Sequence, residues 1–237
     1  MKAMILAAGL GTRLKPFTEN HPKALLPVNG KSLLQRNVEY LHSFGINNII
    51  VNVHHFAEQV ITAIEKNNGW GCNVVVSDET NEVLETGGGL KKAASYFKDS
   101  SEPFVLMNAD ILTDLDIAAM KINYDISNVL ATLAVTNRQT SRYLLFNENN
   151  ILCGWLNDKT GEQKGKSGIK KAFSGIHIIS PQIFEFITEE GKFSMIDLYL
   201  RVAAAGHQIN CYDHSNGKLL DVGKPESLAI AEATFSP

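Results

Sequence analysis

The first 110 residues of the chain alternate between short apolar runs and segments with helical spacing of apolar residues. Four apolar runs have the composition of parallel strands that are covered on both faces. They lie at residues 3–7, 48–53, 73–76 and 103–108. The helical segments between them lie at residues 33–45, 56–64 and 89–97. Three consecutive β-α-β units predict an α/β fold of the Rossmann-like, doubly wound type, with a mostly parallel sheet and helices on both faces.

The second half of the chain is less regular. We expect further strands at residues 129–135, 172–179, 208–212 and 218–222, and a hairpin over residues 143–156. Helices are expected at residues 181–188, at 194–205 and from Pro225 onward. Residues 160–171 are polar and contain three glycines, which predicts a mobile loop. Neither an internal repeat nor a linker divides the chain, so we expect a single domain over residues 1–237.

Composition excludes several classes of protein. A chain of 237 residues with 44% hydrophobic and 20% charged residues can bury a sizeable core and is not disordered. Its net charge of −3 provides no basic field for nucleic acid or an anionic membrane, and no apolar run is long enough to span a bilayer. Cys72, Cys153 and Cys211 are scattered, which argues against a disulfide framework and a thiolate zinc site. These features predict a cytoplasmic protein without a nucleic-acid or membrane partner.

A glycine-rich, basic segment follows the first apolar run. Gly9 and Gly11 allow the backbone to turn tightly and to present N–H groups to anionic oxygens. Arg13, Lys15 and Lys23 add three cations close by. A leucine replaces the third glycine of Gly-x-Gly-x-x-Gly, and the Walker A sequence is missing. A solvated surface loop could carry the same charges. The position at the end of the first strand, where open α/β sheets bind ligands, favours phosphate binding.

This segment continues into a long motif over residues 6–28, Leu-Ala-Ala-Gly-Leu-Gly-Thr-Arg-Leu-x-Pro-x-Thr-x-x-x-Pro-Lys-x-Leu-x-Pro-Val. The motif resembles the signature of the sugar-1-phosphate nucleotidyltransferases, which react a nucleoside triphosphate with a sugar 1-phosphate to give a nucleotide sugar and pyrophosphate. The resemblance implies that Arg13 and Lys23 are catalytic: Arg13 grips the triphosphate, and Lys23 steadies the α-phosphate and the incoming phosphate. The nucleotide contacts that it implies in this loop are Leu6, Ala7, Ala8, Gly9, Gly11 and Thr12.

A second segment, Leu-Glu-Thr-Gly-Gly-Gly-Leu at residues 84–90, resembles the base-binding loop of that family. The further nucleotide contacts that the resemblance implies are Thr86, Gly87, Gly88 and Asn108. Considered alone, the glycines predict a flexible turn before a helix, because three successive glycines are costly inside one. Many family members carry a base-reading glutamine slightly earlier. Glu79, Thr80 or Glu82 occupies that stretch here, so the base stays open.

Two carboxylates more than 100 residues apart resemble the metal site of the family. Asp110 ends the fourth apolar run, and Asp221 lies in Leu-Asp-Val-Gly. The resemblance implies that both bind Mg²⁺, which proteins hold through one or two carboxylates plus substrate phosphates. An aspartate at a strand end is otherwise a turn or capping residue. Asp114 and Asp116 lie nearby, and we expect Asp116 to cap the next helix.

The sugar-phosphate side resembles the family less closely. Ser174 and Gly175 lie in Phe-Ser-Gly-Ile, which is similar to the family strand that faces the acceptor. The Glu-Lys-Pro motif of the family is not intact, and Asn157 and Lys159 stand in its place as the expected sugar-phosphate contacts. The resemblance thus divides the domain into a nucleotide-binding half, residues 1–115, and a sugar-phosphate-binding half, residues 116–237.

The resemblance implies an Mg²⁺-dependent enzyme whose partners are a nucleoside triphosphate and a sugar 1-phosphate. The chain most resembles the N-acetylmuramate 1-phosphate uridylyltransferases, so we expect UTP and an N-acetylmuramate- or hexosamine-type sugar 1-phosphate. Mannose-1-phosphate guanylyltransferases, which use GTP, are the alternative. A non-catalytic nucleotide-sugar-binding regulator is a further alternative. Loss of Arg13, Lys23, Asp110 or Asp221 would favour it, and all four residues are present. A glycosyltransferase would show Asp-x-Asp where residues 108–110 are Asn-Ala-Asp. We expect a monomer or small homo-oligomer.

Overall fold

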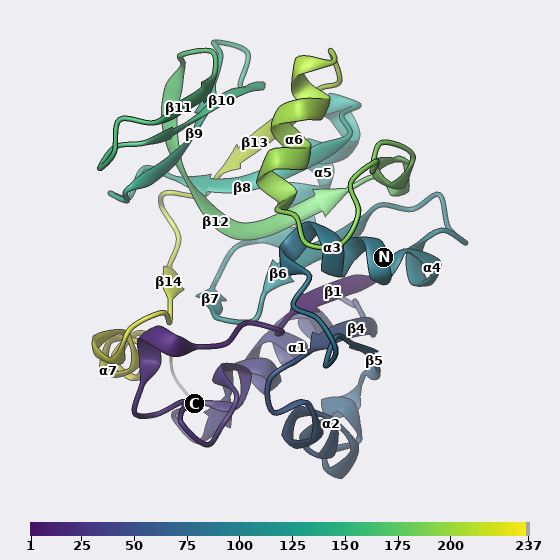
Figure 1. Cartoon of the computed structure of the whole chain (residues 1–237), viewed down its shortest axis with the longest axis vertical. Helices are drawn as coiled ribbons and strands as arrows, with labels where there is room; N and C mark the ends of the chain where they lie inside the picture. The colour runs from purple at the N-terminus through teal and green to yellow at the C-terminus, as the bar shows by residue number, and fades with distance from the viewer. Residues whose placement is uncertain (236–237) are drawn as a thin grey trace.

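The computed structural model describes residues 1–235 and contains one ten-stranded mixed sheet with two small two-stranded sheets (Figure 1). The strands are β1 (Ala3–Leu6), β2 (Pro27–Val28), β3 (Lys31–Ser32), β4 (Asn48–Val53), β5 (Asn73–Asp78), β6 (Phe104–Asn108), β7 (Ile111–Thr113), β8 (Ala131–Thr136), β9 (Arg142–Phe146), β10 (Leu152–Asn157), β11 (Gln163–Gly165), β12 (Ile169–Ile179), β13 (Ile209–Asp213) and β14 (Leu219–Asp221). The helices are α1 (Leu33–Ser43), α2 (Ala57–Lys66), α3 (Glu85–Lys92), α4 (Ala94–Phe97), α5 (Ile117–Ser127), α6 (Met195–Ala204) and α7 (Pro225–Thr234). No helix among residues 1–235 is long and apolar enough to cross a membrane.

The first half forms the parallel part of the large sheet, as predicted. The strand order is β5-β4-β1-β6, and every pair in it is parallel. The chain leaves β5 at the edge and returns as β6 on the other side of β1. The carboxyl ends of β1 and β6 therefore flank the point at which the strand order reverses. Doubly wound sheets bind ligands at such points.

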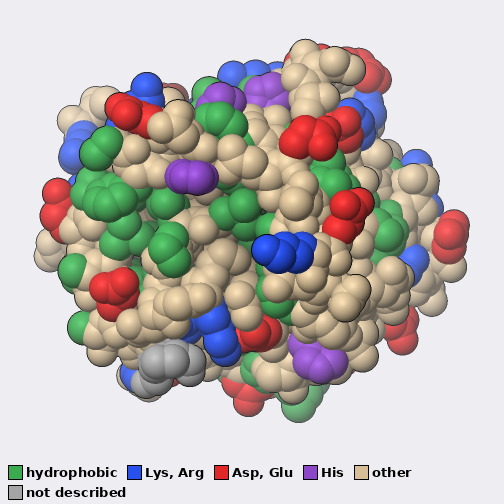
Figure 2. All heavy atoms as spheres, turned by 90° about the horizontal axis from the view of Figure 1, so that it is seen from below, with side chains coloured by type: hydrophobic (Ala, Val, Ile, Leu, Met, Phe, Trp, Pro, Cys, Tyr) green, Lys and Arg blue, Asp and Glu red, His purple; other side chains and the backbone are tan. Residues whose placement is uncertain are grey.

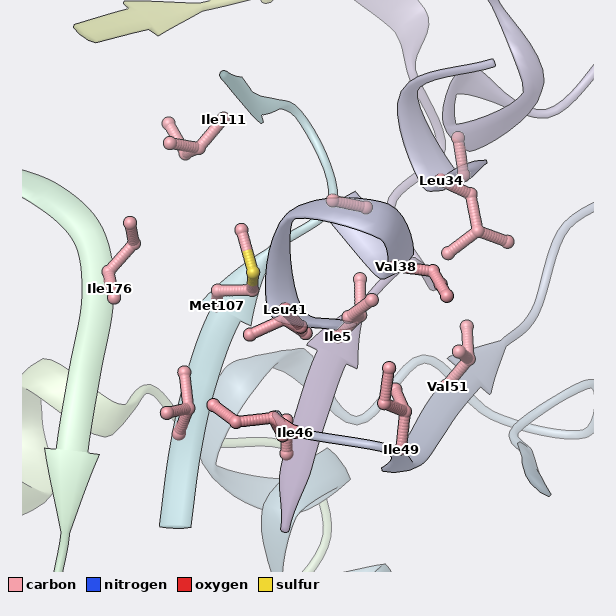
Figure 3. Packing of buried hydrophobic residues seen from close by; sticks show 14 of the residues in the cluster. Ile5, Leu34, Val38, Leu41, Ile46, Ile49, Val51, Met107, Ile111 and Ile176 are labelled. Carbon is pink, nitrogen blue, oxygen red and sulfur yellow. The ribbon is translucent and has the colours of Figure 1, made fainter. Parts of the chain in front are cut away.

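Side chains of β1 alternate between two hydrophobic layers, so helices cover both faces of the sheet. Ile5 belongs to the layer under α1, α2 and α5, and Met4 belongs to the layer under α3, α4 and α6. Figure 3 shows Leu34, Val38 and Leu41 of α1 directed at the strands. Each of these three side chains is fully buried, which stabilises the fold by about 1.5–3 kcal/mol per side chain. The packing of α1 holds in place the strands that end at the cleft described below.

The second half adds antiparallel strands through the long strand β12. This strand pairs with β6 and β8 over one stretch and with β9 near its start. The predicted mobile loop at residues 160–171 is wrong in part, because residues 163–165 form β11 against β10 and β12 begins at Ile169. All three residues of β11 are exposed at the sheet edge, so their polarity reflects exposure rather than disorder. The expected helix at residues 181–188 is a short 3₁₀ turn, Pro181–Glu185.

Acidic and basic side chains are mixed on one face of the molecule. Figure 2 shows the face seen from below in Figure 1, where acidic and basic side chains are interspersed. The net charge of −3 therefore forms no large field of one sign on this face.

The run of three glycines lies inside α3, not before a helix as expected. The reason is close packing against the segment that leads into α6. A Cβ atom on Gly87 would lie 2.3 Å from the ring of Phe193, and one on Gly88 would lie 2.2 Å from the backbone oxygen of Gly191. No larger residue fits at either position, so tertiary contact outweighs the low helix propensity of glycine.

Gly88→Ala should therefore destabilise the protein, although the same change in an exposed helix interior stabilises it by about 1 kcal/mol. We expect a loss of about 1–3 kcal/mol in the free energy of unfolding, because the new methyl group overpacks the contact with Gly191. Urea denaturation monitored by circular dichroism measures this difference. A gain in stability would contradict the close packing of α3.

Candidate active site

A cleft of about 670 Å³ opens at the carboxyl ends of β1 and β6. Most of the predicted nucleotide contacts and both predicted catalytic residues line it. They are Leu6, Ala7, Ala8, Gly9, Gly11, Thr12, Arg13, Lys23, Thr86 and Asn108, and the predicted metal ligand Asp110 lines the cleft as well. The topology explains this convergence, because both strands end where the strand order reverses.

The glycine-rich loop is anchored at one end and open at the other. Gly11 adopts a left-handed conformation, with φ of +64°, and its carbonyl oxygen accepts a hydrogen bond of 2.8 Å from the Thr18 hydroxyl. Leu14 is fully buried and packs in a third hydrophobic cluster. Nothing lies within 4 Å of a Cβ placed on Gly9. The backbone around Gly9 is therefore accessible to a ligand while the rest of the loop is fixed.

Lys23 and Asp110 form an ion pair in the floor of the cleft. The ammonium group of Lys23 donates to Oδ2 of Asp110, and both side chains are largely buried, with exposed fractions of 14% and 23%. The lysine lies after the glycine-rich loop, whereas the aspartate follows β6. This contact therefore ties the loop to the end of the central sheet.

Pairing of β14 with β7 brings Asp221 to the same place. Asp221 is opposite Ile111 in the register, and the N–H of Val222 donates to the carbonyl oxygen of Asp110 at 2.9 Å. Burial raises the pKa of the Asp221 carboxyl, and the neighbouring Asp110 raises it further, although Lys23 and other cations lower it. Asp221 does not itself line the cleft, but it lies beside Gly223, which does. Two neighbouring carboxylates that repel each other provide oxygen ligands of the kind that Mg²⁺ prefers.

The two nearby aspartates have structural partners. Oδ1 of Asp114 accepts from the backbone N–H of Lys218 at 2.6 Å, which holds the start of β14. Oδ1 of Asp116 accepts from the N–H of Ala119, so Asp116 caps α5 as predicted. Among residues 1–235, no cluster of three or more Asp, Glu, His or Cys side chains could hold a metal ion alone.

Asn52 and Glu79 form a buried pair that supports the glycine-rich loop and that the sequence did not reveal. Oδ1 of Asn52, which lines the cleft, accepts from the N–H of Ala7 at 2.7 Å, and its amide group donates to Glu79 at 2.8 Å. Burial raises the pKa of the Glu79 carboxyl. A Cβ on Gly89 would lie 2.8 Å from Oε1 of Glu79, so the same pair also packs against α3. Asn52 therefore links the two segments that resemble nucleotide-binding loops.

The turn at the start of α3 contacts the segment before α6. The Thr86 hydroxyl oxygen accepts from the N–H of Met195 at 2.9 Å, and the N–H of Gly87 donates to the carbonyl of Phe193. Gly87 and Gly88 are buried in this contact and do not line the cleft. Glu85 does line it, with a left-handed φ of +59° and an ion pair to Lys192 at 3.4 Å. Positive φ is uncommon for a residue other than glycine.

The predicted sugar-phosphate residues lie outside the cleft lining. Ser174 is fully buried, and its hydroxyl bonds Nε2 of His214 at 2.8 Å. Gly175 packs behind Asn108. Neither Asn157 nor Lys159 lines the cleft, and Lys159 is exposed.

Arg142 is the basic residue from the second half of the chain that lines the cleft. It begins β9 and pairs with Asn157 of β10 in the register. The sequence analysis missed it because a single arginine at a strand start belongs to no motif. The antiparallel extension of the sheet brings it to the cleft that the glycine-rich loop also lines.

A family model described as nucleotidyl transferase matches residues 2–236. The chain belongs to this family. The N-acetylmuramate alpha-1-phosphate uridylyltransferase of Caulobacter vibrioides is 30% identical to it over 99% of this chain and 96% of that protein. The protein of the same name from Neisseria meningitidis is 31% identical over 98% and 97%. The structure of HddC from Yersinia pseudotuberculosis complexed with GMP-PN superposes with a TM-score of 0.79, at 27% identity over 99% of both chains.

These relatives confirm the reaction class that the motif at residues 6–28 predicts. The chain is a sugar-1-phosphate nucleotidyltransferase, with the mixed, mostly parallel sheet of that family. Besides these uridylyltransferases, the chain is similar to guanyltransferases. The mannose-1-phosphate guanyltransferase of Yarrowia lipolytica is 28% identical over 95% of this chain and 61% of that protein.

Asn52→Leu should raise the KM for the nucleotide about tenfold and lower kcat less, because the N–H of Ala7 loses its acceptor and the loop loosens. Steady-state kinetics with the nucleotide varied measure this split. Asn48→Leu makes the same change at the exposed start of β4 and serves as the control. A normal nucleotide KM in Asn52→Leu would show that the loop does not depend on this bond.

Proposed function

We propose that this enzyme transfers a uridylyl group from UTP to an N-acetylmuramate- or hexosamine-type sugar 1-phosphate. The two uridylyltransferases that match nearly the whole chain support this substrate pair. The observation that carries the reaction is the meeting of the glycine-rich loop and the Lys23–Asp110 pair at one cleft, with Asp221 held beside Asp110 by the pairing of β14 with β7. The second candidate is guanylyl transfer to mannose 1-phosphate, which the guanyltransferase relatives and the HddC complex with GMP-PN favour.

The proposed reaction is a displacement at the α-phosphorus of the nucleotide. An oxygen of the sugar 1-phosphate forms a bond to that phosphorus, the bond to the β-phosphate oxygen breaks, and pyrophosphate leaves with the electron pair. The attacking oxygen is already anionic at neutral pH, so the site needs no general base. The protein must instead align the two phosphates and offset their charge.

The cleft residues suit these two tasks. Arg13, on the loop, is positioned to neutralise the departing pyrophosphate. Lys23, between the loop and β6, can contact the α-phosphate and the incoming phosphate. Arg142, from the other half of the chain, is our candidate for the sugar phosphate in place of Lys159.

Asp110 and Asp221 would hold the Mg²⁺. The two carboxylates repel each other, which contributes to the raised pKa of Asp221, and a shared cation would relieve this repulsion. Two carboxylates leave the remaining ligand positions to phosphate oxygens and water. When bound, the ion would neutralise negative charge on the triphosphate. Lys23 would keep Asp110 oriented toward the cleft through their ion pair.

A pyrophosphate-release screen tests the proposed substrates. UTP, GTP, CTP, dTTP and ATP are each combined with N-acetylmuramate, N-acetylglucosamine, glucose and mannose 1-phosphates in the presence of Mg²⁺. We expect the highest kcat/KM for UTP with the N-acetylmuramate or hexosamine substrate. Highest activity for GTP with mannose 1-phosphate would support the second candidate, and no release with any pair would contradict both.

The same assay tests the loop. Arg13→Ala should lower kcat by about 100-fold, since it removes a charge that stabilises the leaving group. Lys15→Ala is the matched control, because Lys15 lies on the same loop but does not line the cleft. An Arg13→Ala enzyme with normal kcat would contradict the role of the loop.

Asp221→Asn and Asp110→Asn should keep the fold but lose most activity, and the remaining activity should require more Mg²⁺. The double variant should be little worse than the poorer single one, because both carboxylates would serve one ion. Activity titrated against Mg²⁺ measures the shift. Asp116→Asn is the control, since asparagine caps a helix about as well as aspartate. A normal Mg²⁺ titration for Asp221→Asn would exclude it as a ligand.

A further inference from the structure

One polar side chain interrupts the buried face of α1. The buried residues of this helix are Leu33, Leu34, Asn37, Val38 and Leu41, and Asn37 is the polar one among them. Its exposed fraction is 2%. A leucine in its place would bury more apolar surface, which stabilises a core. A carboxamide is tolerated in such a position where hydrogen bonds within the protein replace those that it loses to water.

Asn37 contacts the segment that carries Asp110. Its amide group donates to the carbonyl oxygen of Ala109 at 2.8 Å, and this hydrogen bond is buried. β6 ends at Asn108, so this carbonyl lies just beyond the last residue of the strand. The N–H of Ala109 still donates to the carbonyl of Leu6 at 3.0 Å. Asn37 thus supplies a donor to a buried backbone carbonyl at the point where the chain leaves the sheet.

Hydrogen bonds fix the peptide groups on both sides of Asp110. The carbonyl of Ala109 and the N–H of Asp110 belong to one planar peptide group, so the bond from Asn37 orients that group. The next peptide group contains the carbonyl of Asp110, which accepts from the N–H of Val222 at 2.9 Å. These two groups together set the direction in which the Asp110 side chain leaves the backbone, because only φ and ψ rotate between them. The carboxylate then meets Lys23.

Three distant parts of the chain therefore hold one aspartate. Asn37 lies 72 residues before Ala109, Val222 follows β14, and Lys23 follows the glycine-rich loop. A rotation of the peptide group that Asn37 holds would move the carboxylate oxygens of Asp110 away from Asp221. Side chains that orient a metal ligand in this way affect metal affinity without touching the ion.

A second donor on α1 reaches the other end of the same segment. Tyr40 lies one turn after Asn37, and its hydroxyl donates to the carbonyl oxygen of Leu115 at 2.6 Å. Strand β7 separates this contact from Asp110. The bond from Tyr40 therefore fastens the segment to α1 without holding a peptide group of Asp110. The two side chains thus separate attachment of the segment from orientation of its carboxylate.

We propose that Asn37 is a positioning residue for the metal site, because it orients Asp110 by holding the carbonyl of Ala109. Asn37 does not line the cleft, so it acts on the ion through Asp110. The inference rests on the proposed role of Asp110 as a ligand of Mg²⁺. It adds a contribution of α1, a core helix, to the affinity for the ion.

Binding of Mn²⁺ tests this proposal by electron paramagnetic resonance, since Mn²⁺ is paramagnetic and takes the same kinds of oxygen ligand as Mg²⁺. The enzyme is titrated with Mn²⁺ in the presence of the nucleoside triphosphate that is most active in the pyrophosphate-release screen. The sugar 1-phosphate is omitted, so no turnover occurs. Asn37→Leu should weaken Mn²⁺ binding by about tenfold or more. Asn37→Ser, which is too short to reach Ala109, should also weaken it and provides a second test if Asn37→Leu fails to fold.

Tyr40→Phe is the matched control. It removes a hydrogen bond to a backbone carbonyl from the same helix, so it should lower the urea midpoint of unfolding, as Asn37→Leu does. Its Mn²⁺ affinity should nevertheless equal that of the unmodified enzyme. Asp110→Asn is the positive control and should weaken Mn²⁺ binding at least as much as Asn37→Leu.

The failures of the two proposals can be distinguished. Normal Mn²⁺ affinity in both Asn37 variants, together with weak binding in Asp110→Asn, would overturn the role of Asn37 alone. Normal affinity in Asp110→Asn would overturn the proposed metal site and the role of Asn37 with it. An equal loss of affinity in Tyr40→Phe and Asn37→Leu would also overturn that role, because the loss would then follow from general destabilisation.

Discussion

The candidate active site depends on the short antiparallel pairing of β14 with β7. Asp221 lies opposite Ile111, and a hydrogen bond of 2.9 Å joins the next residue to the carbonyl of Asp110. The two carboxylates are more than 100 residues apart in the chain, and this pairing brings them together in space. Asp114 holds the start of β14, and the third hydrophobic cluster packs Val222 near the glycine-rich loop. The segment that begins with β14 is thus part of the same candidate site as the glycine-rich loop.

Close packing of α3 against the segment before α6 also positions residues of the cleft. The glycines of α3 allow the helix to approach the segment before α6, and the hydroxyl of Thr86 accepts from the N–H of Met195. Asn52 connects this helix to the glycine-rich loop through Glu79 and Ala7. The walls of the cleft therefore support each other, which keeps backbone N–H groups in fixed positions for an anionic ligand.

The two ends of the sheet differ in charge as well as position. The cleft at the carboxyl ends of β1 and β6 is lined by Arg13, Lys23 and Arg142 together with Asp110, which suits phosphates and a divalent cation. The opposite end collects carboxamides around Asn210 together with His207, and no carboxylate, lysine or arginine belongs to that lining. One sheet thus presents two cavities of about equal volume whose linings differ in charge.

Much of the fold and part of the site follow from the sequence alone. Apolar runs and helical spacing predicted the parallel strands β1, β4, β5 and β6, because burial on both faces demands continuous apolar residues. The glycines and cations of residues 6–28 predicted phosphate binding, and the resemblance of this motif to the sugar-1-phosphate nucleotidyltransferases predicted the reaction class.

Tertiary structure decided what depends on contacts between distant segments. The polar edge strand β11 was predicted as a loop, because polarity reports exposure and not hydrogen bonding. The helical glycines, the buried Asn52–Glu79 pair and the approach of Arg142 to the cleft all depend on neighbours far away in the chain. The sequence by itself determined which residues could bind phosphate, and the packing of the sheet decided which of them meet. Local periodicity records burial and backbone preference, but it contains no information about which distant side chain occupies the adjoining space.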